Sequence, residues 1–193
     1  METAMYRPAM RLELKAELDR LCAIAHGFGG SLIRQPPATT EQIGRVESLT
    51  GIVFDGDLRG LYDFSNGGEY PQTWFAAETD ELTPFRFLTL DEVLEYAESD
   101  SHYNPHIDNS DVPWDPRHQR YDWHSLWLPF AVFNNGGSKL YFDADPTPEG
   151  RFGQIISYQH DPDAVRYTAG GLVEFLQESN NILEEEGERW LAP

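Results

Sequence analysis

The stretch Trp127-Leu-Pro-Phe-Ala-Val-Phe-Asn-Asn-Gly-Gly-Ser-Lys-Leu-Tyr-Phe-Asp143 predicts a β-hairpin at the centre of the fold. Residues 126–133 form the most apolar run of the chain, and residues 139–143 return as a strand rich in aromatic side chains. Between them, Asn134-Asn-Gly-Gly137 tolerates the positive φ angles that a reversing turn requires. We therefore expect the sheet to be built outward from this hairpin.

Two further strands are expected after the hairpin, over residues 151–158 and 165–167. Consecutive strands joined by short turns form an antiparallel meander. The residues before the hairpin are mostly helical in pattern, with short strand candidates at 74–76 and 85–88, and one helix follows the meander. The predicted fold class is α+β, an antiparallel β-sheet meander with N-terminal helices and a C-terminal helix packed on it.

Side chains typical of helix starts recur along the first half of the chain. Thr39 is followed three residues later by Gln42, and Thr89 by Glu92, so each pair predicts a capping box. Asp55 is a third candidate N-cap. Three helices are expected to begin at these positions.

Apolar periodicity predicts the buried faces of the helices. It places a first helix over residues 9–25 and a last helix that is capped by Thr168. The buried stripes are expected to consist of Leu14, Leu18, Leu21, Cys22 and Ala25 in the first helix; Ile43, Val46 and Leu49 in the second; Leu58, Leu61 and Tyr62 in the third; and Leu172, Phe175, Leu176 and Leu183 in the last.

Length and charge restrict the possible partners. A chain of 193 residues with 40% hydrophobic residues suits a single domain over 1–193. The 33 acidic residues outnumber the 14 Lys and Arg, for a formal net charge of -19. Such a charge repels nucleic acid and anionic lipid and favours a basic protein partner. An acidic surface that serves only solubility is the alternative that charge leaves open.

The single cysteine, Cys22, excludes an intramolecular disulfide and a cysteine-based zinc site. Residues 1–11 lack the pattern of a secretory signal, and no stretch approaches the roughly 20 apolar residues that span a bilayer. We therefore expect a cytoplasmic protein.

Residues 99–125 form a long segment without periodicity, and such segments are uncommon in compact domains and often functional. Its aromatic residues indicate that it packs on the body of the protein. It also supplies side chains that could ligate a metal: His102, His106, Asp108, Asp111, Asp115, His118, Asp122 and His124. Their spacing matches no metal-site signature, so a polar loop is favoured and no cofactor is expected.

The sequence carries no pattern typical of catalysis. It has no Gly-x-Ser-x-Gly elbow, no phosphate-binding loop and no dinucleotide fingerprint. Trp74, Trp114, Trp123 and Trp127 are candidates for interface anchors or for core packing, and core packing is favoured for Trp127. A binding protein is therefore expected rather than an enzyme.

Several motifs in a fixed order give the chain a family resemblance. They are Pro36-Pro-Ala-Thr-Thr-Glu-Gln-Ile43, Leu58-Arg-Gly-Leu-Tyr-Asp-Phe-Ser-Asn-Gly-Gly68, Phe87-Leu-Thr-Leu-Asp-Glu-Val93, Trp127-Leu-Pro-Phe-Ala131 with Leu140-Tyr-Phe-Asp143, and Gly153-Gln-Ile-Ile156 followed by His160-Asp161. In this order they resemble the Smi1/Knr4 family of the SUKH superfamily. The resemblance covers about residues 36–177, with the helix at 9–25 and the insertion at 99–125 less typical.

The resemblance implies a cytoplasmic immunity protein that binds and neutralises a cognate toxin, such as a basic nuclease, by stoichiometric occlusion. A regulatory or scaffold protein of the Smi1/Knr4 type is the alternative, and a metal-dependent enzyme that uses the loop at 99–125 is a third. No contact with nucleic acid or membrane is expected, and the oligomeric state stays open. The candidate partner-binding residues are Asp108, Asp111, Trp114, Asp115, Asp143, Asp145 and Glu149.

Overall fold

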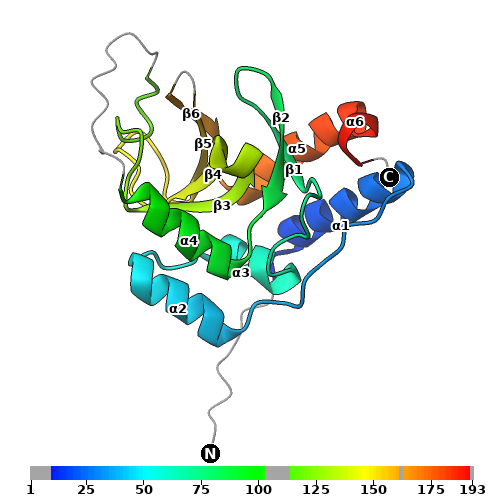
Figure 1. The fold of residues 1–193 in the computed structure, drawn as a ribbon, viewed down its shortest axis with the longest axis horizontal. Helices are drawn as coiled ribbons and strands as arrows, with labels where there is room; N and C mark the ends of the chain where they lie inside the picture. The colour runs from blue at the N-terminus through cyan, green and yellow to red at the C-terminus, as the bar shows by residue number, and fades with distance from the viewer. Residues whose placement is uncertain (1–9, 103–113, 161–162, 192–193) are drawn as a thin grey trace, which may run out of the picture.

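The computed structural model describes residues 10–102, 114–160 and 163–191 (Figure 1). Its elements, in chain order, are α1 (Leu12–Gly27), α2 (Thr40–Thr50), α3 (Gly56–Phe64), β1 (Phe75–Glu78), β2 (Leu82–Phe87), α4 (Leu90–Asp100), β3 (Trp127–Phe133), the 3-10 turn η1 (Asn134–Gly136), β4 (Ser138–Asp143), β5 (Gln154–Gln159), β6 (Ala164–Ala169), α5 (Leu172–Glu186) and α6 (Glu188–Leu191). The predicted α+β class is confirmed.

The strands form one six-stranded sheet in the order β1-β2-β3-β4-β5-β6, and every neighbouring pair is antiparallel. The central hairpin is present as predicted, with Leu128 opposite Phe142 and Val132 opposite Lys139. Its turn places Asn134 and Asn135 at φ 50° and 54°, which asparagine tolerates better than most residues. The meander expected from the sequence is therefore confirmed, extended by β1 and β2 on one side.

The Asn66-Gly67-Gly68 motif ties α3, β2 and α4 together. Asn66 Oδ1 accepts a hydrogen bond from the backbone N–H of Leu90, the first residue of α4, at 3.0 Å. Gly67 has φ +87°, and a Cβ there would lie 2.6 Å from the backbone nitrogen of Thr89. The backbone N–H of Gly68 donates to the carbonyl of Phe87 at 3.0 Å. Only glycine fits at position 67, because any side chain there would meet the backbone at the start of α4.

The predicted helix starts are borne out where local chemistry decides them. Thr39 with Gln42 and Thr89 with Glu92 both form complete capping boxes. The side chain of Asp55 accepts a hydrogen bond from the backbone N–H of Leu58. Each cap satisfies a backbone donor that the first turn of a helix leaves free.

Four expectations about helix bounds and burial need correction. Cys22, expected in the buried stripe of the first helix, is only partly buried. Helix α1 spans Leu12–Gly27 rather than 9–25. Thr168 does not cap the last helix, because it lies inside β6 and Gly171 occupies the N-cap position without a side-chain bond. Leu49 is 66% exposed, because α2 buries only Ile43 and Val46 against its neighbours.

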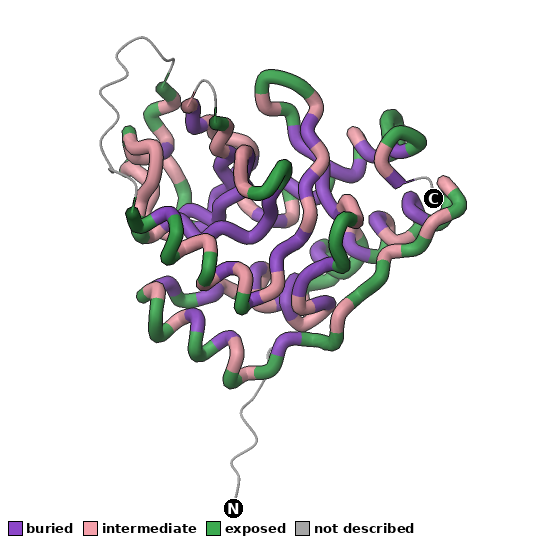
Figure 2. The backbone as a smooth tube through the Cα atoms, in the orientation of Figure 1, coloured by how far each residue is buried: buried purple, intermediate pink, exposed green. Residues whose placement is uncertain are grey.

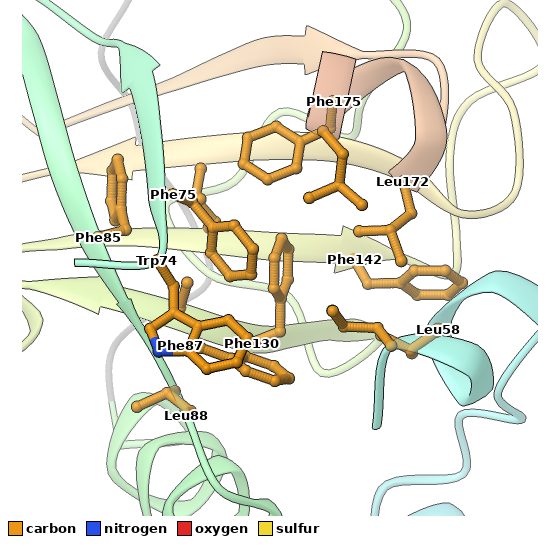
Figure 3. Packing of buried hydrophobic residues seen from close by; sticks show 14 of the residues in the cluster. Leu58, Trp74, Phe75, Phe85, Phe87, Leu88, Phe130, Phe142, Leu172 and Phe175 are labelled. Carbon is orange, nitrogen blue, oxygen red and sulfur yellow. The ribbon is translucent and has the colours of Figure 1, made fainter. Parts of the chain in front are cut away.

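Helices cover the concave face of the curled sheet, with α1 and α5 packed together on one side and α2 beside α4 on the other (Figure 1). The most buried backbone lies in the strands, while the outward turns of α2 and α4 are exposed (Figure 2). Aromatic rings fill the centre (Figure 3): Phe75 contacts Phe87, Phe130 and Phe175 with ring centroids 5.6 to 5.9 Å apart. This arrangement agrees with the expected packing of helices on one sheet.

The edge strand β1 is closed by a side chain of α5. The hydroxyl of Ser179, which is 1% exposed, accepts a hydrogen bond from the backbone N–H of Ala76 at 2.9 Å. A donor on the free side of an edge strand is thereby satisfied inside the chain.

Candidate partner-binding surface

Alternation along β4 gives the sheet a second face, which carries both apolar and polar side chains. Leu140 and Phe142 point into the core, whereas Tyr141 lies in a separate cluster on the opposite face with Trp127 and Ile156. Successive side chains of a strand point to opposite sides, so Lys139 shares the face of Tyr141. We call this the outer face of the sheet.

Residues 114–126 pack over the outer face. His118 is 1% exposed, and its ring lies 6.2 Å from the ring of Trp127 between centroids. Its Nδ1 lies 2.8 Å from the carbonyl oxygen of Gln119. Burial lowers the pKa of His118, so the ring is held neutral. The expectation that the long segment packs on the body is confirmed for these residues.

A pocket of about 250 Å³ lies beside the hairpin turn on this face. We call it the turn pocket. It is lined by Asp100, Asp122, Trp123, Asn135, Gly136, Gly137, Lys139, Tyr141, Tyr158, His160 and Asp163. Segments far apart in the sequence therefore meet there: the end of α4, the segment after residue 114, the hairpin turn and the turn between β5 and β6.

The floor of the turn pocket is a buried ion pair. Lys139 Nζ lies 2.5 Å from Asp100 Oδ1, and the hydroxyl of Tyr141 donates to Asp100 Oδ2 at 2.7 Å. The rings of Tyr96 and Tyr158 lie 5.9 and 5.5 Å from the ammonium of Lys139. Asp100 is the last residue of α4, where a carboxylate opposes the helix dipole, so the lysine offsets that cost.

One wall of the pocket is a hydrogen-bonded group at the start of β6. Asp163 Oδ1 accepts from the Tyr158 hydroxyl at 2.7 Å and lies 2.7 Å from Nδ1 of His160. Asp122 lines the same pocket, and its Oδ1 is shielded from water and has no hydrogen-bond partner among the described residues. Burial, together with the nearby charge of Asp163, raises the pKa of Asp122 to about 6. The carboxylate of Asp122 is therefore charged at neutral pH without a balancing group of its own.

Replacing Asp122 with Asn is expected to stabilise the fold at pH 7.5. A carboxylate whose folded pKa exceeds its unfolded value reduces stability as pH rises, and the loss is complete above the folded value of about 6. Asp122→Asn should therefore raise the free energy of unfolding by about 1 kcal/mol at pH 7.5, after allowance for solvent screening.

The measurement is urea denaturation of wild type and variant between pH 3.5 and 8. The difference should shrink as pH falls through 6 and vanish near pH 3.5. The exposed substitution Glu185→Gln serves as the control, and a difference that does not depend on pH would contradict the assignment.

A second hollow, of about 300 Å³, shares Asn135 with the turn pocket. Tyr70 and Phe133, which line it, are 74% and 40% exposed. The turn itself packs on α4, since a Cβ at Gly136 would lie 2.8 Å from Cε1 of Tyr96. The exposed rings of Tyr70 and Phe133 therefore lie close to the polar lining of the turn pocket, and we call this combined surface the hairpin tip. A mixture of aromatic and polar groups is typical of protein interfaces.

The structure places the predicted contact residues that it describes near the other end of β4. Asp143 is fully buried: its carboxylate accepts from Gln154 Nε2 at 2.8 Å and from the backbone N–H of Asp145 at 3.0 Å. Burial raises the pKa of Asp143 to about 6. Its position makes Asp143 a structural residue of the β4–β5 turn and leaves it no surface to offer a partner in this structure.

Asp115 is held inside its own loop. Its carboxylate receives two hydrogen bonds from the guanidinium of Arg117, at 2.9 and 2.6 Å. These bonds lower the pKa of Asp115 to about 2. Arg117 lies over the ring of Tyr167, 3.2 Å from its centroid, so this pair anchors the loop to β6.

Trp114, Asp145 and Glu149 remain accessible. Trp114 is 43% exposed and donates from Nε1 to the carbonyl of His118 at 3.0 Å. The Asp145 side chain is 45% exposed and lies 3.5 Å from His124 Nε2, and Glu149 is exposed. Asp108 and Asp111 lie outside the described residues. A role of these side chains in partner binding stays a prediction.

The described residues contain no group of three His, Cys, Asp or Glu that could hold a metal ion. Three members of the proposed metal set, His106, Asp108 and Asp111, lie outside the described ranges. Trp74 and Trp127 are 0% and 2% exposed, which agrees with core packing.

The turn pocket was not predicted from the sequence. Its strand residues carried a signal, because Lys139 and Tyr141 alternate with Leu140 and Phe142 and so interrupt an apolar strand with one polar face. No local pattern indicated that Asp100 and Asp122 would meet them.

Comparison with known proteins gives one family. No curated protein matches the chain at the significance required. Across 10–102, 114–160 and 163–191, no helix has both the length and the apolar character needed to cross a membrane. The SMI1/KNR4 family model (SUKH-1) matches residues 37–178, which is most of the chain and includes every strand of the sheet. The chain therefore belongs to the SMI1/KNR4 family (SUKH-1), and this membership supports an immunity-type role in general.

Proposed function

We propose that this protein binds a basic toxin and neutralises it by stoichiometric occlusion in the cytoplasm. The observation that carries the proposal is the family membership, which favours a binding protein over a catalyst. The net charge of -19 favours a positively charged partner, because opposite electrostatic fields accelerate association and suppress the binding of acidic competitors.

The hairpin tip is the surface that suits this function best. It combines the exposed rings of Tyr70 and Phe133 with the carboxylates of the turn pocket. Aromatic side chains in well-packed surroundings supply most of the binding energy at interfaces, and charges set the association rate. The accessible side chains Trp114, Asp145 and Glu149 form the alternative contact surface.

The mechanism is a steric one. An acidic, aromatic surface that covers the nucleic-acid site of a basic nuclease would occupy the positions that phosphates use and exclude the substrate. The inhibitor then needs no chemistry of its own, and its rate of capture matters most.

The test is co-expression of the tagged protein with the product of a neighbouring reading frame, followed by size exclusion, mass spectrometry and a growth-rescue assay. A stable complex with rescue is expected, together with an association rate that falls several-fold between low salt and 0.15 M salt. A toxic neighbour that forms no complex and is not rescued would refute the pairing. A complex without toxicity or rescue would instead favour the regulatory or scaffold function.

A further inference from the structure

We propose that the turn pocket receives one arginine side chain of the protein partner. The inference rests on the proposed function, since it names the chemical group by which the partner is held. It depends on three features of the pocket: an excess of carboxylates over ammonium groups, aromatic walls and a rigid floor.

The charges of the turn pocket favour a cation. Among its described lining residues, the carboxylates of Asp100, Asp122 and Asp163 outnumber the ammonium of Lys139. Lys139 is paired with Asp100 at 2.5 Å, and Asp163 is held by Tyr158 and His160. Asp122 therefore carries the charge that is least compensated within the pocket. The Asp122 side chain is partly buried, and its Oδ1 is shielded from water and has no hydrogen-bond partner in the described chain, which is unfavourable for a charged group. An entering cation would remove that cost.

The walls favour guanidinium over ammonium. Trp123, Tyr141 and Tyr158 line the same pocket. A guanidinium is planar, stacks on aromatic rings, is weakly hydrated and presents five donors in a fixed fork. An ammonium is compact and strongly hydrated, so its transfer into a pocket of about 250 Å³ costs more. Arginine therefore suits the pocket better than lysine.

The pocket is formed before a ligand arrives. Its floor is fixed by the bonds of Asp100 to Lys139 and Tyr141. Its rim is the hairpin turn, which packs on Tyr96. A preorganised site spends little binding energy on ordering its own side chains.

Binding is expected to depend on pH through Asp122. The titratable groups that line the pocket with it are Asp163, His160 and Tyr158 from the β5–β6 side, Lys139 and Tyr141 from β4, and Asp100 from α4. With a pKa of about 6, Asp122 is charged at pH 7.5 and largely protonated at pH 5. Affinity for a cation should therefore fall as pH decreases through 6.

The experiment uses the full-length protein and three small probes: N-acetyl-arginine amide, N-acetyl-lysine amide and the neutral isostere N-acetyl-citrulline amide. Binding is followed at pH 7.5 by the indole N–H signal of Trp123 in ¹H–¹⁵N spectra, assigned with Trp123→Phe. The arginine probe is expected to give a saturable shift, with weaker binding of the lysine probe and none of the citrulline probe.

Charge removal tests the site directly. Asp122→Asn should weaken arginine binding, and Asp122→Asn/Asp163→Asn should weaken it about tenfold or more. The matched control is Glu185→Gln/Glu186→Gln, which removes the same charge at the exposed end of α5 and should leave the affinity unchanged. Because Asp122→Asn is expected to stabilise the fold, a loss of binding in that variant cannot be ascribed to unfolding.

The outcomes separate this inference from the proposed function. Equal binding of arginine and citrulline probes, or unchanged binding in the double variant, overturns the arginine site even where the toxin complex forms. Selective arginine binding without any toxin partner supports the site and overturns the immunity function. Preference for lysine overturns the choice of guanidinium.

Discussion

Replacing Lys139 with Met is expected to lower the free energy of unfolding by about 3–5 kcal/mol. The substitution keeps an apolar stem of similar length and removes only the ammonium. The carboxyl group of Asp100, whose side chain is 2% exposed, would then lie in the interior without the cation that is now 2.5 Å away. The end of α4 would repel the same carboxylate, because a helix C-terminus carries partial negative charge.

Urea denaturation against a matched surface pair measures this effect. Lys15 and Asp19 lie at the same 2.5 Å separation, but their side chains are 59% and 58% exposed. Lys15→Met should cost no more than about 1 kcal/mol, because water screens an exposed pair. The double substitution Asp100→Asn/Lys139→Met should recover most of the loss. An equal loss of unfolding free energy in Lys139→Met and Lys15→Met would show that burial does not determine how much the Lys139–Asp100 pair contributes to stability.

Replacing Gly68 with Ala is expected to cost about 3 kcal/mol or more. A Cβ at this position would lie 2.5 Å from Cδ1 of Trp74 and closer still to its Nε1. Trp74 is fully buried and packs with its ring centroid 5.3 Å from that of Phe87, so it has no room to retreat. The added methyl group must therefore displace either the backbone of the Asn66-Gly67-Gly68 motif or the ring of Trp74 in the core.

The control for this prediction is Gly44→Ala. Gly44 lies inside α2, and a Cβ there would meet no atom within 4 Å. That substitution should stabilise the protein by about 0.5–1 kcal/mol, because alanine loses less entropy in a helix. Both variants are compared by urea denaturation and, should Gly68→Ala fail to fold, by circular dichroism of the purified chain. A Gly68→Ala variant with wild-type stability would disprove the close approach of Trp74.

Sequence reasoning succeeded where neighbouring residues decide the structure. Thr39 and Thr89 act through atoms three residues away, and the Asn134–Gly137 turn is set by its own φ angles. It was wrong at Thr168, where pairing with β5 extends the strand past a residue that could equally cap a helix. Tertiary pairing outweighs a local preference there.

The candidate site was less accessible to such reasoning. Asp143 looked like a turn residue at the surface, but Gln154 reaches it from the next strand and the loop at 114–126 covers it. The turn pocket joins Asp100 and Lys139, which are 39 positions apart. A sequence pattern reports which face a side chain occupies, and it contains no information on which distant element meets that face.

The hydroxyl of Ser179 on β1 has a consequence for self-association. A sheet can grow by accepting another chain at either edge, and fibre growth requires that both edges remain open. At β1 the donor of Ala76 is already satisfied and α5 lies against the strand, so addition there is blocked. Within the described sheet the other edge is β6, and two copies joined through β6 would each present the protected β1 edge outward. A sheet with one protected edge can form a pair by strand addition but not an open-ended series, so the Ser179 hydroxyl acts against polymerisation of an aromatic-rich chain.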